Sequence, residues 1–382
     1  MKTAANITIE KTKNLKPCIH GGEVWEAADR TGRKREEILD FSSSVNPLGP
    51  SPEALEAIKN SFGQISSYPD SNSTQLRRAI ANHFGGISEN NVVIGNGSTE
   101  IIYLFAETFM KKGDTALIPA PTFGEYESAV RKAGAEPKSV KLNADFHVDL
   151  NTVLQEMHKA KIVFLCNPNN PTSVLAPPET LTAIMDEALE NGVLVFLDED
   201  FLEFIPEEKQ FSMINKIHSY PNLLILRSFT KIFGLTGLRV GYGIASEGIV
   251  TALSNVKIPW NVNCLAQAAA AAAINDAEHL KKTHDLIKTE KAFLTNGLQQ
   301  IKGFKVHPAD ANFFLIDTRE TGFTANQLKQ RMLDYCILIR DCSSFRELDP
   351  YYVRVAVKTR VENERLLEAF SKTVMTEREP CS

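Results

Sequence analysis

Short apolar runs alternate with longer amphipathic stretches over the first two thirds of the chain. The apolar runs, which predict strands, lie at 91–95, 114–119, 161–166, 193–197, 223–226 and 240–245. Amphipathic stretches between them predict helices at 98–109, 126–133 and 178–191. Alternating strands and helices are typical of an α/β protein, because a crossover between parallel strands needs a connection long enough for a helix. We therefore expect a mostly parallel sheet flanked by helices.

The pattern changes near residue 259. An alanine-rich run follows at 264–273, and one long helix with charges on its outer face is predicted at 277–299. Further strands are predicted at 313–316, 337–339 and 352–356, and further helices at 325–335 and 361–373. A chain of 382 residues is too long for one ordinary core. We expect a large domain (50–265), a small discontinuous α/β domain (1–49 with 280–382) and a connecting helical region (266–279).

The composition is that of a globular protein, with 43% hydrophobic and 23% charged residues. The net charge of -5 argues against a nucleic acid or an anionic membrane surface as the main partner. No apolar run approaches the roughly 20 residues that span a bilayer, and the first residues lack the apolar segment of a signal peptide. We therefore expect a cytoplasmic protein with no membrane partner.

The six cysteines are few and scattered, which argues against a secreted disulfide framework. Cys336 and Cys342 are close enough in sequence to contribute to a metal site, but no CxxC pair or nearby histidine supports one. We therefore expect no metal, and the sequence assigns no role to Cys336, Cys342 or Cys381.

Four predicted turns carry unusual residues at strand ends, where ligands of parallel α/β sheets gather. They are GNGSTE at 95–100, NPNNPTS at 167–173, DEDF at 198–201, and SFTKIFG at 228–234 followed by LTGLRVGY at 235–242. Small residues at a helix start, as in the first turn, leave backbone N–H groups free to bind a phosphate. In the second turn the prolines suppress helix, which leaves the Asn amides as hydrogen-bonding groups.

The last two turns carry charges directly after apolar strands. The three carboxylates at 198–200 repel one another, so at least one should face a cation or solvent. Lys231 lies among apolar residues, where desolvation lowers the pKa of an amine, as a nucleophile or Schiff-base former needs. Ser228 and Arg239 flank Lys231 with groups that bind phosphate. We therefore expect Lys231 to be functional.

Together and in this order, the four turns resemble those of the aspartate-aminotransferase superfamily of pyridoxal-phosphate enzymes, fold type I. The resemblance extends over about residues 20–370. It implies a mostly parallel sheet of the seven-stranded type and pyridoxal 5'-phosphate as the cofactor. It also implies that Lys231 forms the internal aldimine, that Asp198 pairs with the pyridinium nitrogen, and that Asn170 hydrogen-bonds the ring oxygen O3′. A carboxylate at that nitrogen keeps it protonated, so the ring can accept electrons.

The same resemblance implies further cofactor contacts. Phe123 would stack on the cofactor ring, and Phe201 stands where many relatives have a Tyr that helps to hold O3′. Tyr68 would reach the cofactor phosphate of the neighbouring subunit, which implies a homodimer. Within one subunit, the phosphate would be held by Gly97, Ser98, Thr99, Ser228 and Arg239.

Within the superfamily, the chain resembles both histidinol-phosphate aminotransferases and threonine-phosphate decarboxylases. Features similar to the decarboxylases are HGG at 20–22, DFSSSVNPLGP at 40–50, the GNGSTE turn, Phe201 and IRDCSSF at 339–345. The main expectation is therefore decarboxylation of O-phospho-L-threonine to (R)-1-aminopropan-2-yl phosphate for cobalamin biosynthesis, with Lys231 as the candidate proton donor after carbon dioxide leaves. The alternative is a histidinol-phosphate or related amino-acid aminotransferase.

The expected substrate is a small phosphorylated amino acid. Arg354 matches the superfamily arginine that binds a substrate anion, and Arg340 lies one predicted strand earlier. We expect these two arginines to share the substrate phosphate and carboxylate, in an order that the sequence leaves open, and His20, Gly21 and Asn46 to close the site. A transcription regulator with this fold is a distant alternative, because the segment before the large domain is not strongly basic.

Overall fold

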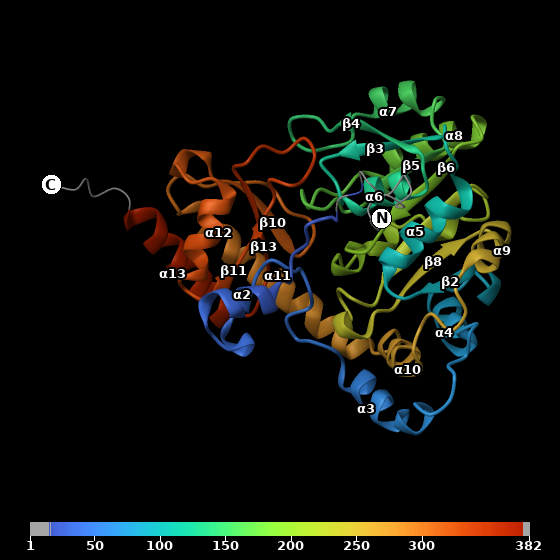
Figure 1. Cartoon of the computed structure of the whole chain (residues 1–382), viewed down its shortest axis with the longest axis horizontal. Helices are drawn as coiled ribbons and strands as arrows, with labels where there is room; N and C mark the ends of the chain where they lie inside the picture. Colours follow the sequence, from blue (N-terminus) through green and yellow to red (C-terminus); the bar gives the residue numbers. More distant parts are fainter. Residues whose placement is uncertain (1–14, 16, 377–382) are drawn as a thin grey trace, which may run out of the picture.

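A seven-stranded sheet forms the centre of the larger part of the molecule in the computed structural model, which describes residue 15 and residues 17–376 (Figure 1). The strands, in spatial order, are β2 (Val92–Gly95), β8 (Gly241–Ala245), β7 (Leu223–Ser228), β6 (Leu194–Asp198), β5 (Ile162–Cys166), β3 (Thr115–Ala120) and β4 (Glu136–Lys141). β8 runs in the direction opposite to the other six strands of this sheet, so both of its pairings, with β2 and with β7, are antiparallel. The predicted α/β fold with a mostly parallel sheet is confirmed.

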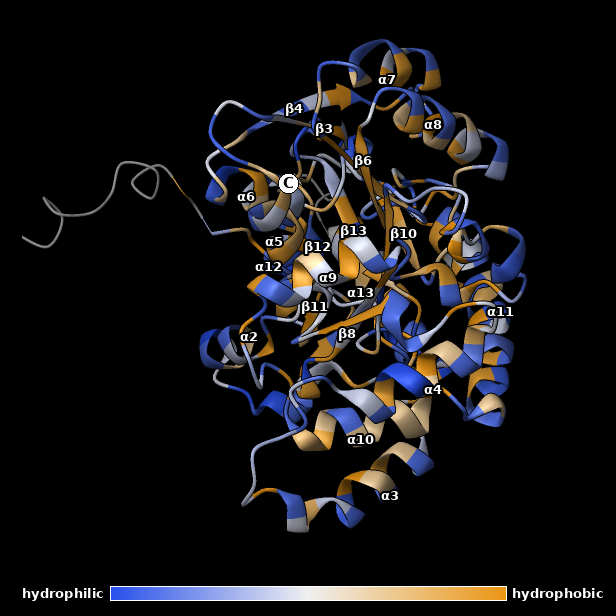
Figure 2. Ribbon diagram, turned by 90° about the vertical axis from the view of Figure 1, so that its right-hand side faces the viewer, coloured by the Kyte–Doolittle hydropathy of each residue, from blue (hydrophilic) through white to orange (hydrophobic). Residues whose placement is uncertain are grey.

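Helices cover both faces of this sheet, so its central strands are apolar on both sides. Alternate strand residues such as Phe164 and Phe196 pack with α5 (Ser98–Phe109), α6 (Glu125–Lys132) and α9 (Glu247–Val256) on one face. Their neighbours Val163 and Leu197 face α7 (Leu150–Met157) and α8 (Pro178–Glu190) on the other. Figure 2 shows the corresponding pattern, with apolar strands inside and hydrophilic helix faces outside. The strand β4 was not predicted, because it is an edge strand with the polar sequence EPKSVK.

The C-terminal part contains a four-stranded antiparallel sheet. Its strands, in spatial order, are β12 (Arg340–Asp341), β13 (Tyr352–Ala356), β10 (Phe313–Asp317) and β9 (Lys305–Val306). The helices α11 (Ala277–Gln299), α12 (Ala325–Leu333) and α13 (Arg360–Thr376) lie beside it (Figure 1). The predicted helix at 277–299 matches α11.

The N-terminal segment joins this C-terminal part. The strand β1 (Leu39–Asp40) pairs in parallel with β11 (Ile337–Leu338), and α2 (Val24–Thr31) packs its buried alanines against Leu333 and Leu338. Three further helices, α3 (Pro52–Asn60), α4 (Thr74–Phe84) and α10 (Cys264–Ala273), pack together below the large sheet in Figure 1. This arrangement is consistent with a discontinuous small domain, whose exact boundaries stay a prediction.

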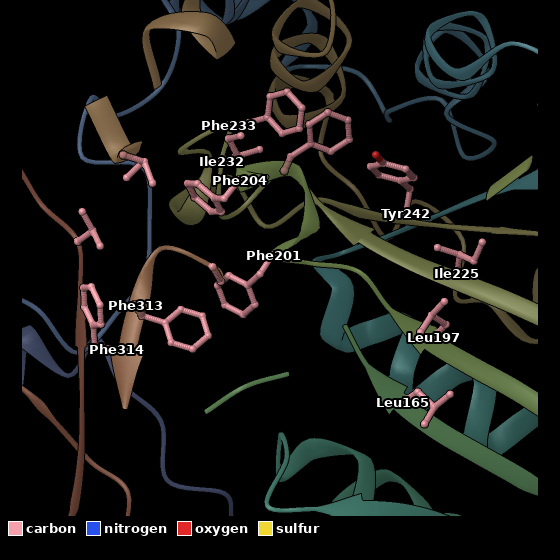
Figure 3. Packing of buried hydrophobic residues seen from close by; sticks show 14 of the residues in the cluster. Leu165, Leu197, Phe201, Phe204, Ile225, Ile232, Phe233, Tyr242, Phe313 and Phe314 are labelled. Carbon is pink, nitrogen blue, oxygen red and sulfur yellow. The ribbon is translucent and has the colours of Figure 1, made fainter. Parts of the chain in front are cut away.

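Buried side chains connect the two parts (Figure 3). Leu165 and Leu197 of the large sheet belong to the same cluster of buried side chains as Phe313 and Phe314 of β10. The Phe201 ring, in the turn after β6, meets the Phe313 ring with centroids 4.9 Å apart. The carboxyl edge of the large sheet therefore faces the small sheet, and residues of both can line one cavity. In the part of the chain that the structure describes, no helix is long and apolar enough to cross a membrane.

Candidate active site

Two adjoining cavities lie at the carboxyl edge of the large sheet, because the turns after its parallel strands converge there. The inner cavity, of about 860 Å³, is lined by residues that include Asp198, Asp200 and Lys231. The outer cavity, of about 630 Å³, extends from it toward β12 and the chain segment before α2. Residues that line both are His20, Gly21, Phe123, Asn170 and Arg354.

Lys231 follows β7 and its amine lies in the inner cavity, 5.4 Å from the centroid of the Phe201 ring. Burial lowers the pKa of Lys231, while the charges of Asp200 and, to a smaller extent, Asp198 raise it. An amine with a lowered pKa is available as a nucleophile closer to neutral pH than an ordinary lysine. The surroundings of Lys231 therefore suit a Schiff-base former.

Asp198 is buried at the end of β6. Its Oδ2 accepts a hydrogen bond from the Tyr126 hydroxyl at 2.6 Å, and its Oδ1 accepts one from the Asp200 backbone N–H at 2.9 Å. Burial, and after it the charge of Asp200, raises the pKa of Asp198 to about 8. A cation beside this carboxylate, such as a protonated pyridine nitrogen, would oppose that rise. Tyr126, which the sequence analysis missed, orients the carboxylate.

The start of α5 offers an anion site beside Lys231. Gly97 has φ of +79°, and a Cβ there would lie 2.5 Å from Nη2 of Arg239, so glycine lets the guanidinium approach the helix start. Ser98 and Thr99 are the first residues of α5, where unpaired backbone N–H groups and the helix dipole favour an anion. Ser98, Thr99, Arg239 and Thr230 line the inner cavity together. This group of residues suits a phosphate.

Two predicted site residues lie behind the cavity wall. Ser228 is fully buried and its Oγ accepts a hydrogen bond from the backbone N–H of Thr230, so that Thr230 is the residue that lines the cavity. The Asn46 amide is also buried, and it donates to the carbonyl oxygen of Ile232 at 2.7 Å and to Oγ1 of Thr283 at 2.8 Å. Asn46 is not among the residues that line the two cavities, and its amide ties its loop to the turn after Lys231 and to α11. Its expected role in closing the site stays a prediction.

Tyr68 also lies away from the cavities of its own chain. Its side chain is 80% exposed, and its ring stacks on Trp260 with centroids 4.6 Å apart. Other large exposed apolar side chains are Phe62 and Ile65, near Tyr68 in the sequence, and Ile258, near Trp260.

The HGG segment and the DFSSSVNPLGP segment meet at the cavities. The backbone N–H of Gly22 donates to Oγ of Ser42 at 2.7 Å. A Cβ at Gly21 would lie 2.3 Å from the Ser42 carbonyl oxygen, so the two segments approach too closely for a side chain there. Gly21, Gly22 and residues 42–45 all line the inner cavity.

His20 is held at the mouth of the cavities by an acidic residue that the sequence analysis missed. Its Nε2 lies 2.7 Å from Oε1 of Glu125, and the Tyr103 hydroxyl donates to Oε2 of Glu125 at 2.5 Å. Burial raises the pKa of Glu125, but the hydrogen bonds from His20 and Tyr103 outweigh it and hold the pKa below its usual range. Glu125 is therefore ionised at neutral pH and fixes the position of the imidazole.

Arg340 and Arg354 are paired across β12 and β13. Arg354 donates to Oδ1 of Asn170, and burial lowers its pKa to about 10, so it keeps its charge at neutral pH. Arg340 donates to the backbone carbonyl oxygens of Ile19 and His20 at 2.6 and 2.8 Å. The structure thus brings both predicted substrate arginines to the outer cavity, with the N-terminal segment lying against Arg340.

Three polar atoms of the cavity lining are buried without a hydrogen-bond partner among the described residues: Ser44 Oγ, Asp200 Oδ1 and Arg354 Nε. Such atoms are rare in folded proteins, and they favour a polar ligand at this place. With Lys231, Asp198 and Arg239 nearby, the lining fits the expected pyridoxal 5'-phosphate.

Nothing in the described part of the chain groups three or more His, Cys, Asp or Glu side chains in a way that could hold a metal ion. Cys342 is buried and Cys336 half-buried, both as free thiols, and Cys381 lies outside the described residues.

Comparisons with known proteins agree with this geometry. The sequence matches the family described as aminotransferase class I and II over residues 36–370. It is 34% identical over 377 residues to a histidinol-phosphate aminotransferase of Methanothermobacter thermautotrophicus, covering 98% of this chain and 99% of that protein.

Two solved structures are similar to this one. The histidinol-phosphate aminotransferase from Clostridium acetobutylicum has a TM-score of 0.83 at 30% identity, covering 89% of this chain and 100% of that chain. The L-threonine-O-3-phosphate decarboxylase from Porphyromonas gingivalis has a TM-score of 0.78 at 28% identity, covering 88% of this chain and 99% of that chain.

Proposed function

The chain belongs to the class I and II aminotransferase family, and we propose that it is an aminotransferase that acts on histidinol phosphate or a related phosphorylated amine. From the sequence, decarboxylation is the main expectation and this activity the alternative. The similarity to histidinol-phosphate aminotransferases over nearly the whole chain favours the second. The observation that carries the proposal is the inner cavity, which presents Lys231, Asp198 and Arg239 together.

Pyridoxal 5'-phosphate is the cofactor, and when bound it supplies a carbonyl carbon that reacts with amines and a ring that accepts electrons. Lys231 would hold it covalently, and Asp198 would keep its ring nitrogen protonated. Asn170 would hydrogen-bond its ring oxygen, and Phe123 would cover one face of its ring. Its phosphate would lie at the start of α5 against Arg239, where helix N–H groups and a guanidinium meet.

The substrate anions would bind in the outer cavity. Arg340 and Arg354 present two cations there, and His20 and Gly21 line the same cavity. Histidinol phosphate needs one cation for its phosphate, and a dicarboxylate that accepts the amino group needs two. Both half-reactions can therefore use the same pair of arginines.

Decarboxylation of O-phospho-L-threonine to (R)-1-aminopropan-2-yl phosphate is the second candidate. It is supported by the meeting of the HGG and DFSSSVNPLGP segments, both similar to decarboxylases, at the cavities. It is also supported by the similarity to the Porphyromonas gingivalis enzyme. O-phospho-L-threonine carries a phosphate and a carboxylate, which would occupy both arginines at once.

The two candidates are separated by two assays on the purified, cofactor-loaded protein. One supplies histidinol phosphate and 2-oxoglutarate and measures glutamate. The other supplies O-phospho-L-threonine and measures carbon dioxide and aminopropanol phosphate. Glutamate without carbon dioxide supports the aminotransferase, and carbon dioxide without glutamate overturns it in favour of the decarboxylase. Loss of the visible absorbance of the bound cofactor in Lys231→Ala tests the covalent attachment.

We also propose that the protein works as a homodimer in which Tyr68 reaches the cofactor phosphate of the other subunit. The exposure of Tyr68 and Trp260, together with that of Phe62, Ile65 and Ile258, supports an apolar contact surface there. Sedimentation equilibrium measures the assembly, and a monomer at micromolar concentration would contradict the proposal.

A further inference from the structure

The turn after β6 carries a carboxylate to which the proposed function gives no role. Asp200 is only 8% exposed and lines the inner cavity with Lys231. Its Oδ2 accepts a hydrogen bond from the Ser98 hydroxyl at 3.0 Å, while its Oδ1 has no partner among the described residues. A buried carboxylate oxygen is costly unless it is hydrogen-bonded or faces a cation. The surroundings of Asp200 should therefore contain its counter-ion.

The charged groups that act on Asp200 come from several elements. Asp198 lies two residues earlier, and the cations that lower the pKa of Asp200 against its burial are, in order, Lys231, Arg239 and Arg227. Arg227 is committed to buried glutamates such as Glu199, which it meets at 2.8 Å.

The remaining cations differ in where they lie. Arg239 is an exposed residue that reaches over Gly97 at the proposed phosphate site. Of the three cations, Lys231 is the one that lines the inner cavity with Asp200 and that has not been assigned another anionic partner.

We propose that Asp200 is the counter-ion of the Lys231 nitrogen and stabilises its protonated form, both in the free amine and when that nitrogen is bonded to the cofactor. The inference rests on the proposed function only in that Lys231 is the residue that binds the cofactor. After burial, which lowers the pKa of Lys231, the charge of Asp200 has the largest effect and raises it. The charges of Arg354 and Arg239, which line the same cavity, lower the pKa of Lys231, and the charge of Asp198 raises it to a smaller extent. The two carboxylates therefore divide their roles, Asp198 for the cofactor ring and Asp200 for the lysine.

This pairing bears on the protonation state from which either reaction begins. A carboxylate that stabilises the ammonium increases the fraction of Lys231 that carries a proton at neutral pH, but it also makes that ammonium a weaker acid and the amine a stronger base. A decarboxylation must deliver a proton to the substrate carbon after carbon dioxide leaves, whereas a transamination must first remove one. Asp200 thus acts as a positioning residue that sets the protonation of Lys231 in either reaction, and the pairing does not separate the two candidate functions.

The test is a pH titration of the visible absorbance of the cofactor-loaded protein, which reports protonation of the nitrogen that links Lys231 to the cofactor. Asp200→Asn keeps the shape of the side chain but removes its charge, so the midpoint should fall by about one pH unit or more, a tenfold change in the protonation constant. Asp200→Glu should restore most of the shift. Asp334→Asn, which removes an exposed carboxylate at the end of α12, is the matched control and should leave the midpoint unchanged.

A midpoint in Asp200→Asn that rises, or that stays within roughly 0.3 pH unit of the parent, overturns the pairing. If this variant does not retain cofactor, a second measurement decides. The rate at which added pyridoxal 5'-phosphate restores the absorbance depends on the unprotonated amine, so its half-maximal pH should fall in the variant and an unchanged value overturns the pairing. Absorbance retained in Lys231→Ala counts against the proposed function, whereas an unshifted Asp200→Asn counts against the role of Asp200 alone.

Discussion

Replacing Arg227 with methionine removes the centre of a buried ion cluster behind the active-site turns. The Arg227 side chain is fully buried, and its guanidinium meets Glu199 at 2.8 Å and Glu203 at 3.5 Å. It also pairs with Glu208. Arg227 belongs to β7 and Glu199 to the turn after β6, so the cluster links the two segments that carry Lys231 and Asp198.

The expected cost follows from the groups left behind. Methionine fills much of the volume but leaves Glu199, whose side chain is fully buried, without its cation. Removing one partner of a buried ion pair costs about 3–5 kcal/mol, because the other charge stays buried and unpaired. We expect Arg227→Met to lower the free energy of unfolding by about that amount at pH 8.

Chemical denaturation of the cofactor-loaded protein, followed by circular dichroism, measures this difference from the shift in midpoint at constant slope. Arg78→Met is the control, because Arg78 pairs with Glu89 on the surface and its loss should change stability little. A loss below about 1 kcal/mol in Arg227→Met would refute the reasoning, since it would mean that the buried carboxylates do not depend on Arg227.

The pH dependence of the same variant supplies a second check. Burial raises the pKa of Glu203 to about 8 and also raises that of Glu199, while Arg227 opposes both shifts. Without Arg227 both carboxyls bind protons in the folded state that they release on unfolding at neutral pH. Stability then falls as pH rises, because the folded state holds more protons than the unfolded one. The loss should therefore be smaller at pH 6 than at pH 9, and the opposite trend would contradict the assignment.

Three substitutions near the cavities test the roles of individual side chains. Glu125→Gln removes the charge of the carboxylate that holds His20, so KM should rise about tenfold with little change in kcat. Steady-state kinetics measures both constants, and a fall in kcat without a rise in KM would contradict this role of Glu125. Tyr126→Phe removes a hydrogen bond to Asp198 and should weaken cofactor binding roughly fivefold. Equilibrium dialysis measures the affinity, and an unchanged affinity would show that the Tyr126 hydroxyl does not support Asp198. Gly97→Ala combines a φ of +79° with a clash and should weaken cofactor binding more than Tyr126→Phe does, so a normal affinity would disprove the close approach.

The periodic pattern predicted the buried elements well, because an apolar strand or a long amphipathic helix has a local signature. The strand β5 and the helix α11 lie almost where the apolar and amphipathic runs begin and end. The edge strand β4 was missed because its residues are half solvated, so that no apolar run marks it. The two-residue strands β1 and β11 are too short for any period, and only their mutual pairing defines them.

The candidate site was predicted where a residue type has a chemical meaning of its own, and missed where position in space decides. A lysine between aromatic residues stands out in the sequence, and Lys231 lies in the inner cavity. Glu125 and Tyr103 lie on different helices, and nothing in the sequence shows that they converge on His20. Asn46 lies within the motif at 40–50 that resembles a ligand-binding segment, yet its amide ties the loop to α11.

The three carboxylates after β6 show how one sequence motif can be divided between two faces of a sheet. Successive side chains of an extended segment point to opposite sides, so Asp198 and Asp200 line the inner cavity while Glu199 points to Arg227 on the far side. The expectation that one of the three would face a cation or solvent is met without exposing any of them. Because Arg227 offsets the charge of Glu199, the repulsion that remains among the three carboxylates is between Asp198 and Asp200. Burial and that repulsion together raise the pKa of Asp198. A cofactor would bring a protonated ring nitrogen to one of these carboxylates, while Lys231 faces the other. Each carboxylate would then have a cation that offsets its burial and the repulsion, so the turn suits a ligand with a cationic ring.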